Sequence, residues 1–97
     1  MKSHSHSAAR FLVRGRVQGV GFRYYAQAAA TRLKVRGWVR NREDGAVEAL
    51  AIAPPQALEK FVAALRQGPP GARVDSVESQ PVEAVDEARH TGFRVEI

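Results

Sequence analysis

The sequence contains no cysteine, and no apolar run approaches the ~20 residues that a membrane-spanning helix needs. The first absence excludes a disulfide framework, a thiolate zinc site and a cysteine nucleophile. The polar start of the chain lacks the apolar core of a secretory signal. A length of 97 residues suits one domain. We therefore expect a soluble, cytoplasmic protein with a disordered tail over 1–8 and one domain over 9–97.

Acidic residues are missing from the first 42 positions. That segment contains ten basic residues, whereas positions 43–97 contain five basic residues and ten acids, so the net charge of +5 is the sum of +10 and −5. A basic segment of this kind indicates an anionic partner. We expect most of its arginines to remain solvated on strand and helix faces, while their summed field attracts a small dianion to this half of the chain.

The hydrophobic pattern predicts the order strand, helix, strand, strand, helix, strand, followed by a short terminal strand. Apolar residues alternate in the first, second and last strands, less regularly in 73–82, and recur at helical spacing in the helices. In the last strand, Phe93, Val95 and Ile97 are expected to point inward. This order indicates an α+β fold with two helices packed on one face of an antiparallel sheet. The predicted segments are 9–17, 22–33, 35–41, 46–53, 54–67, 73–82 and 93–97.

A glycine-rich segment joins the first strand to the first helix, with Gly19 and Gly21 directly before Phe22. Successive N–H groups in such a loop can converge at the positive end of a helix dipole and bind an anion. The segment lacks the Lys-Ser/Thr of a Walker loop, and Tyr24 stands where a dinucleotide fingerprint needs glycine. Arg23 follows in the first helical turn, where the dipole disfavours a purely structural arginine and a guanidinium matches the geometry of a phosphate.

Asn41 is the second candidate, at the end of a strand directly before the predicted turn Glu43–Gly45. Asparagine is common at turns, so a structural role is the alternative. Its amide could also accept a hydrogen bond from a water molecule and donate one to it. His4 and His6 in the tail would make only a weak metal site, and His90 has no second ligand nearby in the sequence. No metal site is expected.

Two segments resemble the signatures of the acylphosphatase family: Val13–Arg23, and Gly37–Asn41 followed by Gly45 and Val47. The segment Gly68–Val74 and the closing Phe93–Val95 are also similar to that family. Ala53 departs from the pattern, because the second signature usually ends there in glycine. The resemblance covers nearly the whole chain beyond the tail and implies a ferredoxin-like sandwich of order βαββαβ.

The resemblance further implies an acylphosphatase, a hydrolase acting on acid anhydrides, which cleaves the carboxyl–phosphate bond of acyl phosphates without a metal or cofactor. By this resemblance the N–H groups of the loop and Arg23 bind the phosphoryl oxygens, and Asn41 positions the attacking water. Inorganic phosphate is then a product and an expected inhibitor, and the protein is expected to be a monomer. The implied substrate-binding residues are Gln18, Gly19, Val20, Gly21, Phe22 and Arg23, and the implied catalytic residues are Arg23 and Asn41.

Two alternatives remain open at this point. An RNA-binding module of the same fold class would use the basic segment, but such domains stack bases on exposed strand aromatics. Here Phe11 is expected to point inward, and Trp38 is alone on its face. The other alternative is a non-catalytic or fused-domain relative that binds a phosphate ligand, which fold alone does not distinguish from an enzyme.

Overall fold

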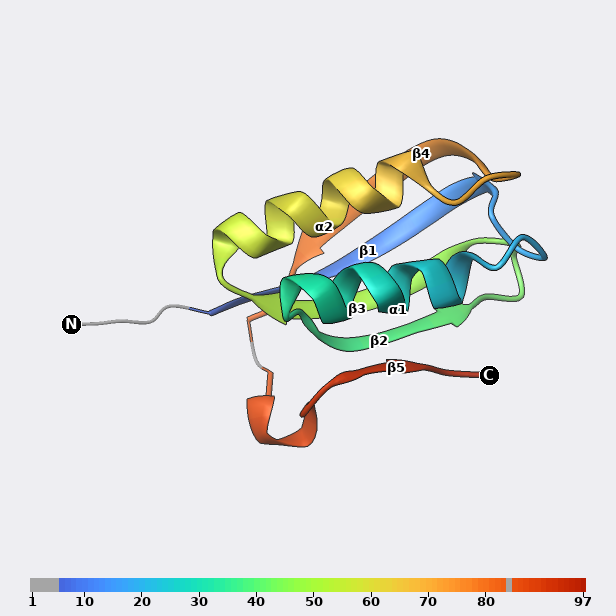
Figure 1. Cartoon of the computed structure of the whole chain (residues 1–97). Coiled ribbons are helices and arrows are strands. Elements are labelled where there is room, and N and C mark those ends of the chain that lie inside the picture. The colour runs from blue at the N-terminus through green and yellow to red at the C-terminus, as the bar shows by residue number, and fades with distance from the viewer. Residues whose placement is uncertain (1–5, 84) are drawn as a thin grey trace.

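The computed structural model describes residues 6–83 and 85–97 as two layers (Figure 1). Helices α1 (Phe22–Leu33) and α2 (Pro55–Gln67) lie on the same side of a five-stranded sheet of order β4-β1-β3-β2-β5. This arrangement confirms the predicted α+β sandwich. The remaining elements are β1 (Ser7–Arg16), β2 (Arg36–Asn41), β3 (Val47–Ala53), β4 (Arg73–Pro81), the 3₁₀ turn η1 (Glu87–Arg89) and β5 (Phe93–Val95).

The C-terminal end of β3 bears on two of the sequence predictions. Strand β1 begins two residues before the predicted start, because Ser7 and Ala8 pair with Ala53 and Ile52 at the end of β3. Ala53, the departure from the family pattern, is buried and does not have a positive φ, so the backbone there does not require glycine. The first five residues of the predicted tail lie outside the described part of the chain.

The register of β3 with its two neighbours brings two distant parts of the chain together. Val13 of β1 and Asn41 of β2 are both cross-strand partners of Val47, at the beginning of β3. Strands β1 and β2 therefore run in the same direction and end at the same end of the sheet. The loop that follows β1 and the hairpin that follows β2 consequently leave the sheet side by side.

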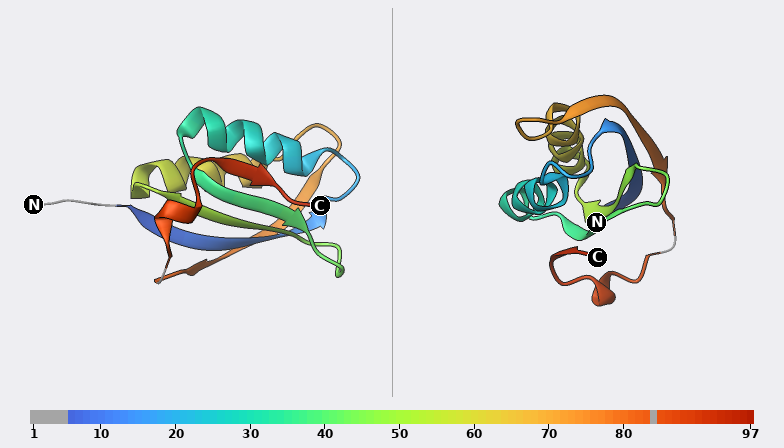
Figure 2. Two further views of the ribbon diagram at one scale, coloured as in Figure 1. Left: turned by 90° about the horizontal axis from the view of Figure 1, so that it is seen from below. Right: turned by 90° about the vertical axis from the view of Figure 1, so that its right-hand side faces the viewer.

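The terminal strand departs from the prediction of an antiparallel sheet. The first four strands are antiparallel, but β5 pairs with β2 in parallel. Strand β4 ends with Pro81 opposite Ala9, at the end of the sheet where β2 begins. A chain that crosses to the far edge from there must run alongside β2 in the same direction (Figure 2).

Ile97 contradicts the prediction that it points inward. Strand β5 ends at Val95, and Ile97 is fully exposed beyond it. Phe93 is buried as predicted, and the Arg36 guanidinium anchors the crossover before it by donating to the carbonyl oxygens of Glu87 and His90 at 3.3 and 3.1 Å. The chain thus gains its last strand from polar anchoring and one buried ring rather than from a full apolar stripe.

The core lies between the helices and the sheet and is centred on Phe61 of α2. Its ring makes edge-on contacts with Phe11 and Phe93, at centroid distances of 6.1 and 5.6 Å. Small residues of α1 (Ala26, Ala29 and Ala30) are buried and let that helix approach the sheet closely. The buried Phe11 confirms the inward orientation predicted for it. Neither described helix is long and apolar enough to span a membrane.

The basic first segment pairs with the acids of the second. Five of its arginines form ion pairs with acids that all lie beyond position 42, and their side chains remain 28–49% exposed, so they stay in contact with solvent as expected. Arg16, Arg23 and Arg32 have no carboxylate within ion-pair distance among the described residues. The unneutralised charge is therefore confined to a few sites. The paired arginines are Arg10, Arg14, Arg36, Arg40 and Arg42.

Gly37 provides a direct test of the β2–β3 register. It has φ +138°, and a Cβ there would lie 1.9 Å from the carbonyl oxygen of Leu50. Gly37→Ala should therefore lower the free energy of unfolding by about 3 kcal/mol, from steric overlap and left-handed strain together. Gly92→Ala is the matched control, because a Cβ at Gly92 meets nothing within 4 Å. Chemical denaturation measures both, and equal stability of the two variants would contradict the register.

Candidate functional site

The candidate site lies at the end of the sheet where β1, β2 and β5 finish. The loop between β1 and α1, the β2–β3 hairpin and the C-terminus gather there, at the right of Figure 1. The sequence predictions placed all their catalytic and substrate-binding residues in this loop, in the first turn of α1 and at the end of β2. The structure brings these segments to one end of the molecule.

The loop backbone presents a set of free donors. Gly19 and Gly21 have φ +78° and +77°, and Gly21 is the N-cap of α1. Within the described chain, none of the amide groups from Gln18 to Phe22 donates to a backbone acceptor, and the first turn of α1 has neither a side-chain cap nor an acidic residue. Unpaired amides at the positive end of a helix attract an anion.

The side chain of Gln18 fastens this loop to the hairpin. Its Nε2 donates to the carbonyl oxygens of Arg42 and Ala46, at 2.8 and 3.0 Å. The sequence predictions assigned Gln18 only a backbone role, and no local pattern indicated this contact, because its acceptors lie 24 and 28 residues away. The loop and the hairpin therefore form one connected unit.

Asp44 stabilises the turn of that hairpin. The backbone N–H of Ala46 donates to the Asp44 carboxylate at 3.1 Å, and the Arg42 guanidinium lies beside it at 3.3 Å. The Ala46 N–H first, and Arg42 second, hold the pKa of Asp44 below its usual value. The carboxylate is therefore ionised at neutral pH and keeps the turn closed.

Arg23 is the second residue of α1, and its position is set by the end of the chain. Its Nη1 donates to the carbonyl oxygen of Glu96 at 2.9 Å, while the Glu96 N–H donates to the carbonyl oxygen of Val39. The Glu96 backbone thus bridges Arg23 to β2, two residues before Asn41. Because the anchor is a carbonyl and not a carboxylate, it brings no negative charge to offset that of Arg23. The sequence did not indicate Glu96 as this partner.

Asn41 is the last residue of β2 and is exposed. It shares its cross-strand partner, Val47, with the β1 strand that leads into the loop, and alternation places its side chain on the helix-bearing side. Its amide has no hydrogen-bond partner among the residues that the structure describes. The backbone of Asn41 is held in the sheet, and its amide is available to a ligand or a water molecule.

The histidines considered as metal ligands do not gather. His4 lies outside the described residues, and His6 Nδ1 is 3.1 Å from Glu87 Oε1, at the end of the sheet opposite the loop. In the two described stretches of the chain, no three His, Asp or Glu side chains come close enough together to hold a metal ion. The groups at the candidate site are thus backbone amides, a guanidinium and a carboxamide.

Known proteins share this arrangement of sequence and fold. The acylphosphatase family model matches residues 9–95. An acylphosphatase of Nitrobacter hamburgensis is 59% identical over 75 residues, 77% of this chain and 76% of its own. One of Koribacter versatilis is 46% identical over 94 residues, 97% of this chain and 84% of its own.

A solved structure is similar as well. The crystal structure of acylphosphatase from Bacillus subtilis superposes with a TM-score of 0.89 at 41% identity, covering 94% of this chain and 99% of that one. The family match covers the two-layer domain, the loop between β1 and α1 and the hairpin that follows Asn41. The chain belongs to the acylphosphatase family.

Proposed function

We propose that the protein hydrolyses acyl phosphates at the end of the sheet where the loop, Arg23 and Asn41 meet. The observation that supports this most directly is the set of unpaired amides from Gln18 to Phe22 beside an arginine that no carboxylate neutralises. The substrate is a small molecule whose phosphoryl group occupies this cradle. The same residue-level assignment follows from the family motifs, onto which these positions map one by one.

The leaving group explains why the groups at the site suffice. Water attacks phosphorus, the bond between phosphorus and the acyl oxygen breaks, and the acyl group departs as a carboxylate. A carboxylate is a stable anion at neutral pH, so no general acid is needed to protonate it. Phosphoryl transfer depends mainly on positioning and on stabilisation of charge. In this proposal the proton of the attacking water passes to the substrate's own phosphate.

The loop amides and Arg23 share the binding of the phosphoryl oxygens. The glycines at 19 and 21 give the loop its left-handed turns, and the dipole of α1 points its positive end at the bound oxygens. Arg23 uses Nη1 to reach Glu96, which fixes its orientation while its other N–H groups remain able to bind oxygen. These donors are in place before the substrate arrives, so little reorganisation accompanies the reaction.

Asn41 positions the attacking water. Its carboxamide can accept a hydrogen bond from the water and donate one to a phosphoryl oxygen, which holds the nucleophile in line with the leaving group. The Glu96 backbone connects Arg23 to the strand that ends at Asn41. Anion binding and water activation are therefore assigned to different segments of the chain.

An RNA-binding role is not favoured. Phe11 is 2% exposed and lies in the core, so it cannot stack on a base. Trp38 is on the opposite face of the sheet, where the Arg40 guanidinium covers its ring at 5.0 Å.

Inorganic phosphate, as product, is proposed to inhibit competitively at the loop. The monomeric state and the cytoplasmic location remain predictions from the sequence.

The activity is tested with benzoyl phosphate in the presence of a chelator. We expect hydrolysis well above the buffer rate and unchanged by EDTA, because the leaving carboxylate needs neither metal nor acid. Glycerol phosphate is the control, since its alkoxide leaving group requires protonation, and it should remain intact. Absence of turnover with benzoyl phosphate, or its loss on chelation, would contradict the proposal.

Arg23→Gln tests the anion cradle. Charge-assisted hydrogen bonds contribute about 1.5–3 kcal/mol each, so the loss of one or two should lower kcat/KM for benzoyl phosphate by roughly 100-fold or more. Arg32→Gln removes the same charge from the last turn of the same helix and should leave kcat/KM within about twofold of the wild type. Near-normal efficiency of the Arg23 variant would exclude this role.

Asn41→Ala separates water positioning from phosphate binding. We expect kcat to fall by about 100-fold, the scale on which loss of one positioned amide acts. The competitive inhibition constant of inorganic phosphate should stay within about twofold, because the loop and Arg23 are intact. Steady-state kinetics measure both quantities. A matching loss of phosphate affinity would instead assign Asn41 to ground-state binding.

A further inference from the structure

Glu48 of β3 is a charged residue in an unusual place. It is 3% exposed, on the face of the sheet opposite the helices, with Leu12 and Arg40 as its cross-strand partners. Burying a carboxylate costs several kcal/mol unless it is paired and hydrogen-bonded. The mechanism proposed above does not use Glu48, so its presence needs a separate explanation.

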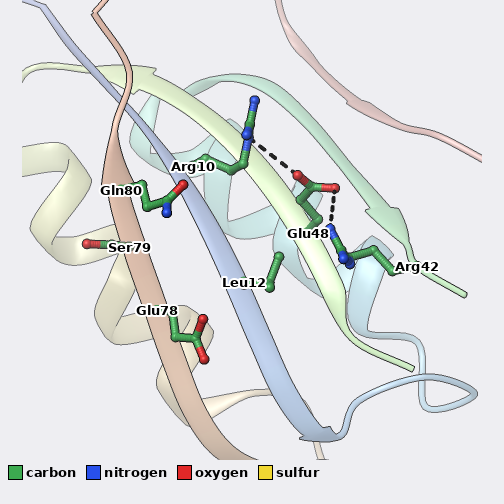
Figure 3. Close-up of a pocket in the computed structure, with 7 residues that line it drawn as sticks. All are labelled: Arg10, Leu12, Arg42, Glu48, Glu78, Ser79 and Gln80. Atoms are coloured by element: carbon green, nitrogen blue, oxygen red, sulfur yellow. Dashed lines mark ion pairs between the residues drawn. The ribbon is translucent and has the colours of Figure 1, made fainter. Parts of the chain in front are cut away.

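Three arginines compensate the charge of Glu48. Arg40 contacts Oε1 through Nη2 and Nε at 2.9 and 3.0 Å, and Arg42 Nη1 lies 3.6 Å from the same oxygen. Arg10 Nε lies 3.4 Å from Oε2. Figure 3 shows the carboxylate between Arg10 and Arg42, beside Leu12. The cluster thus joins β1, β2 and the hairpin through one side chain.

The arginines differ in their relation to the candidate site. Arg40 and Arg42 are the residues on either side of Asn41, whereas Arg10 is on β1. Both neighbours of Asn41 are therefore held by one buried oxygen on the face that Asn41 does not occupy. The carbonyl of Arg42 also accepts the hydrogen bond from Gln18 that fastens the loop between β1 and α1 to the hairpin.

Asn41 needs such support because its own side chain has none. It is exposed at the end of a strand, and its amide makes no hydrogen bond to another described residue. We propose that Glu48 is a positioning residue for the hydrolysis, which orients Asn41 by clamping Arg40 and Arg42. This inference rests on the proposed role of Asn41 as the residue that holds the water.

Stability alone does not explain the cluster. Replacement of a buried ion cluster by apolar residues of similar volume is often neutral or stabilising. Leu12 and Leu50 already supply apolar neighbours on this face, and Leu50 is buried. An apolar side chain at 48 would suit such surroundings, but it would remove the one carboxylate that contacts the side chains of both neighbours of Asn41. The positional requirement accounts for a carboxylate at this place.

The test is a double-mutant cycle on kcat with benzoyl phosphate. Glu48→Gln keeps the shape and removes the charge, and it should lower kcat about tenfold in the wild-type background, on the scale of a misplaced reacting group. The inhibition constant of inorganic phosphate should stay within about twofold. In the Asn41→Ala background the same substitution should change kcat by less than about twofold, because its effect passes through Asn41.

A second pair of variants covers the case in which Glu48→Gln does not fold. Arg40 and Arg10 contact the same carboxylate with side chains 49% and 48% exposed, but only Arg40 adjoins Asn41. Arg40→Met should lower kcat about threefold or more, and only when Asn41 is present. Arg10→Met should leave kcat within about twofold of the wild type. Circular dichroism confirms folding before either measurement.

The outcomes separate this inference from the function on which it rests. If Asn41→Ala leaves kcat unchanged, the role proposed for Asn41 fails and the inference fails with it. If Asn41→Ala lowers kcat but Glu48→Gln or Arg40→Met does not, only the positioning role is overturned. An equal loss of kcat in both backgrounds would also overturn it, because that loss would not depend on Asn41.

Discussion

The pairing of β3 with β1 on one side and β2 on the other is the constraint on which the site depends. Because Val47 is the partner of both Val13 and Asn41, the strand that leads into the loop and the strand that ends at Asn41 finish together. A slip of one residue would turn Asn41 to the other face and its neighbours toward the loop. The close approach of Gly37 to the Leu50 carbonyl opposes such a slip.

Ion pairing adds a second constraint, because it determines which arginines of the first segment have no carboxylate beside them. Acids beyond position 42 pair with five arginines of the first segment, but none of the described acids reaches Arg23. Its anchor, the Glu96 carbonyl, is neutral. Arg16, Arg23 and Arg32 are the first-segment arginines that no described carboxylate pairs with, and of these Arg23 is the one in the first turn of α1, directly after the unpaired amides.

The parts of this site that depend on local sequence could be predicted, and those that depend on long-range contacts could not. Arg23 and Asn41 belong to elements whose periodicity is visible in the sequence. Arg23 lies at the start of α1 and Asn41 at the end of β2, as predicted. The Gln18 and Glu96 contacts join residues 24 or more positions apart. The parallel pairing of β5 depends on where β4 ends, and Ile97 extends past that strand into solvent. Alternation alone conveys neither fact.

The burial of Glu48 is a further feature that local sequence does not predict. Glu48 is the single polar residue of β3, whose other six residues are apolar, and a glutamate in a strand would be expected to face water. The structure buries it because arginines from β1 and β2 cover it, and those arginines are available because the first segment contains so many. The basic segment thus serves two purposes that composition does not separate. Part of it pairs with the internal Glu48 carboxylate, and part of it, at Arg23, has no described carboxylate as a partner.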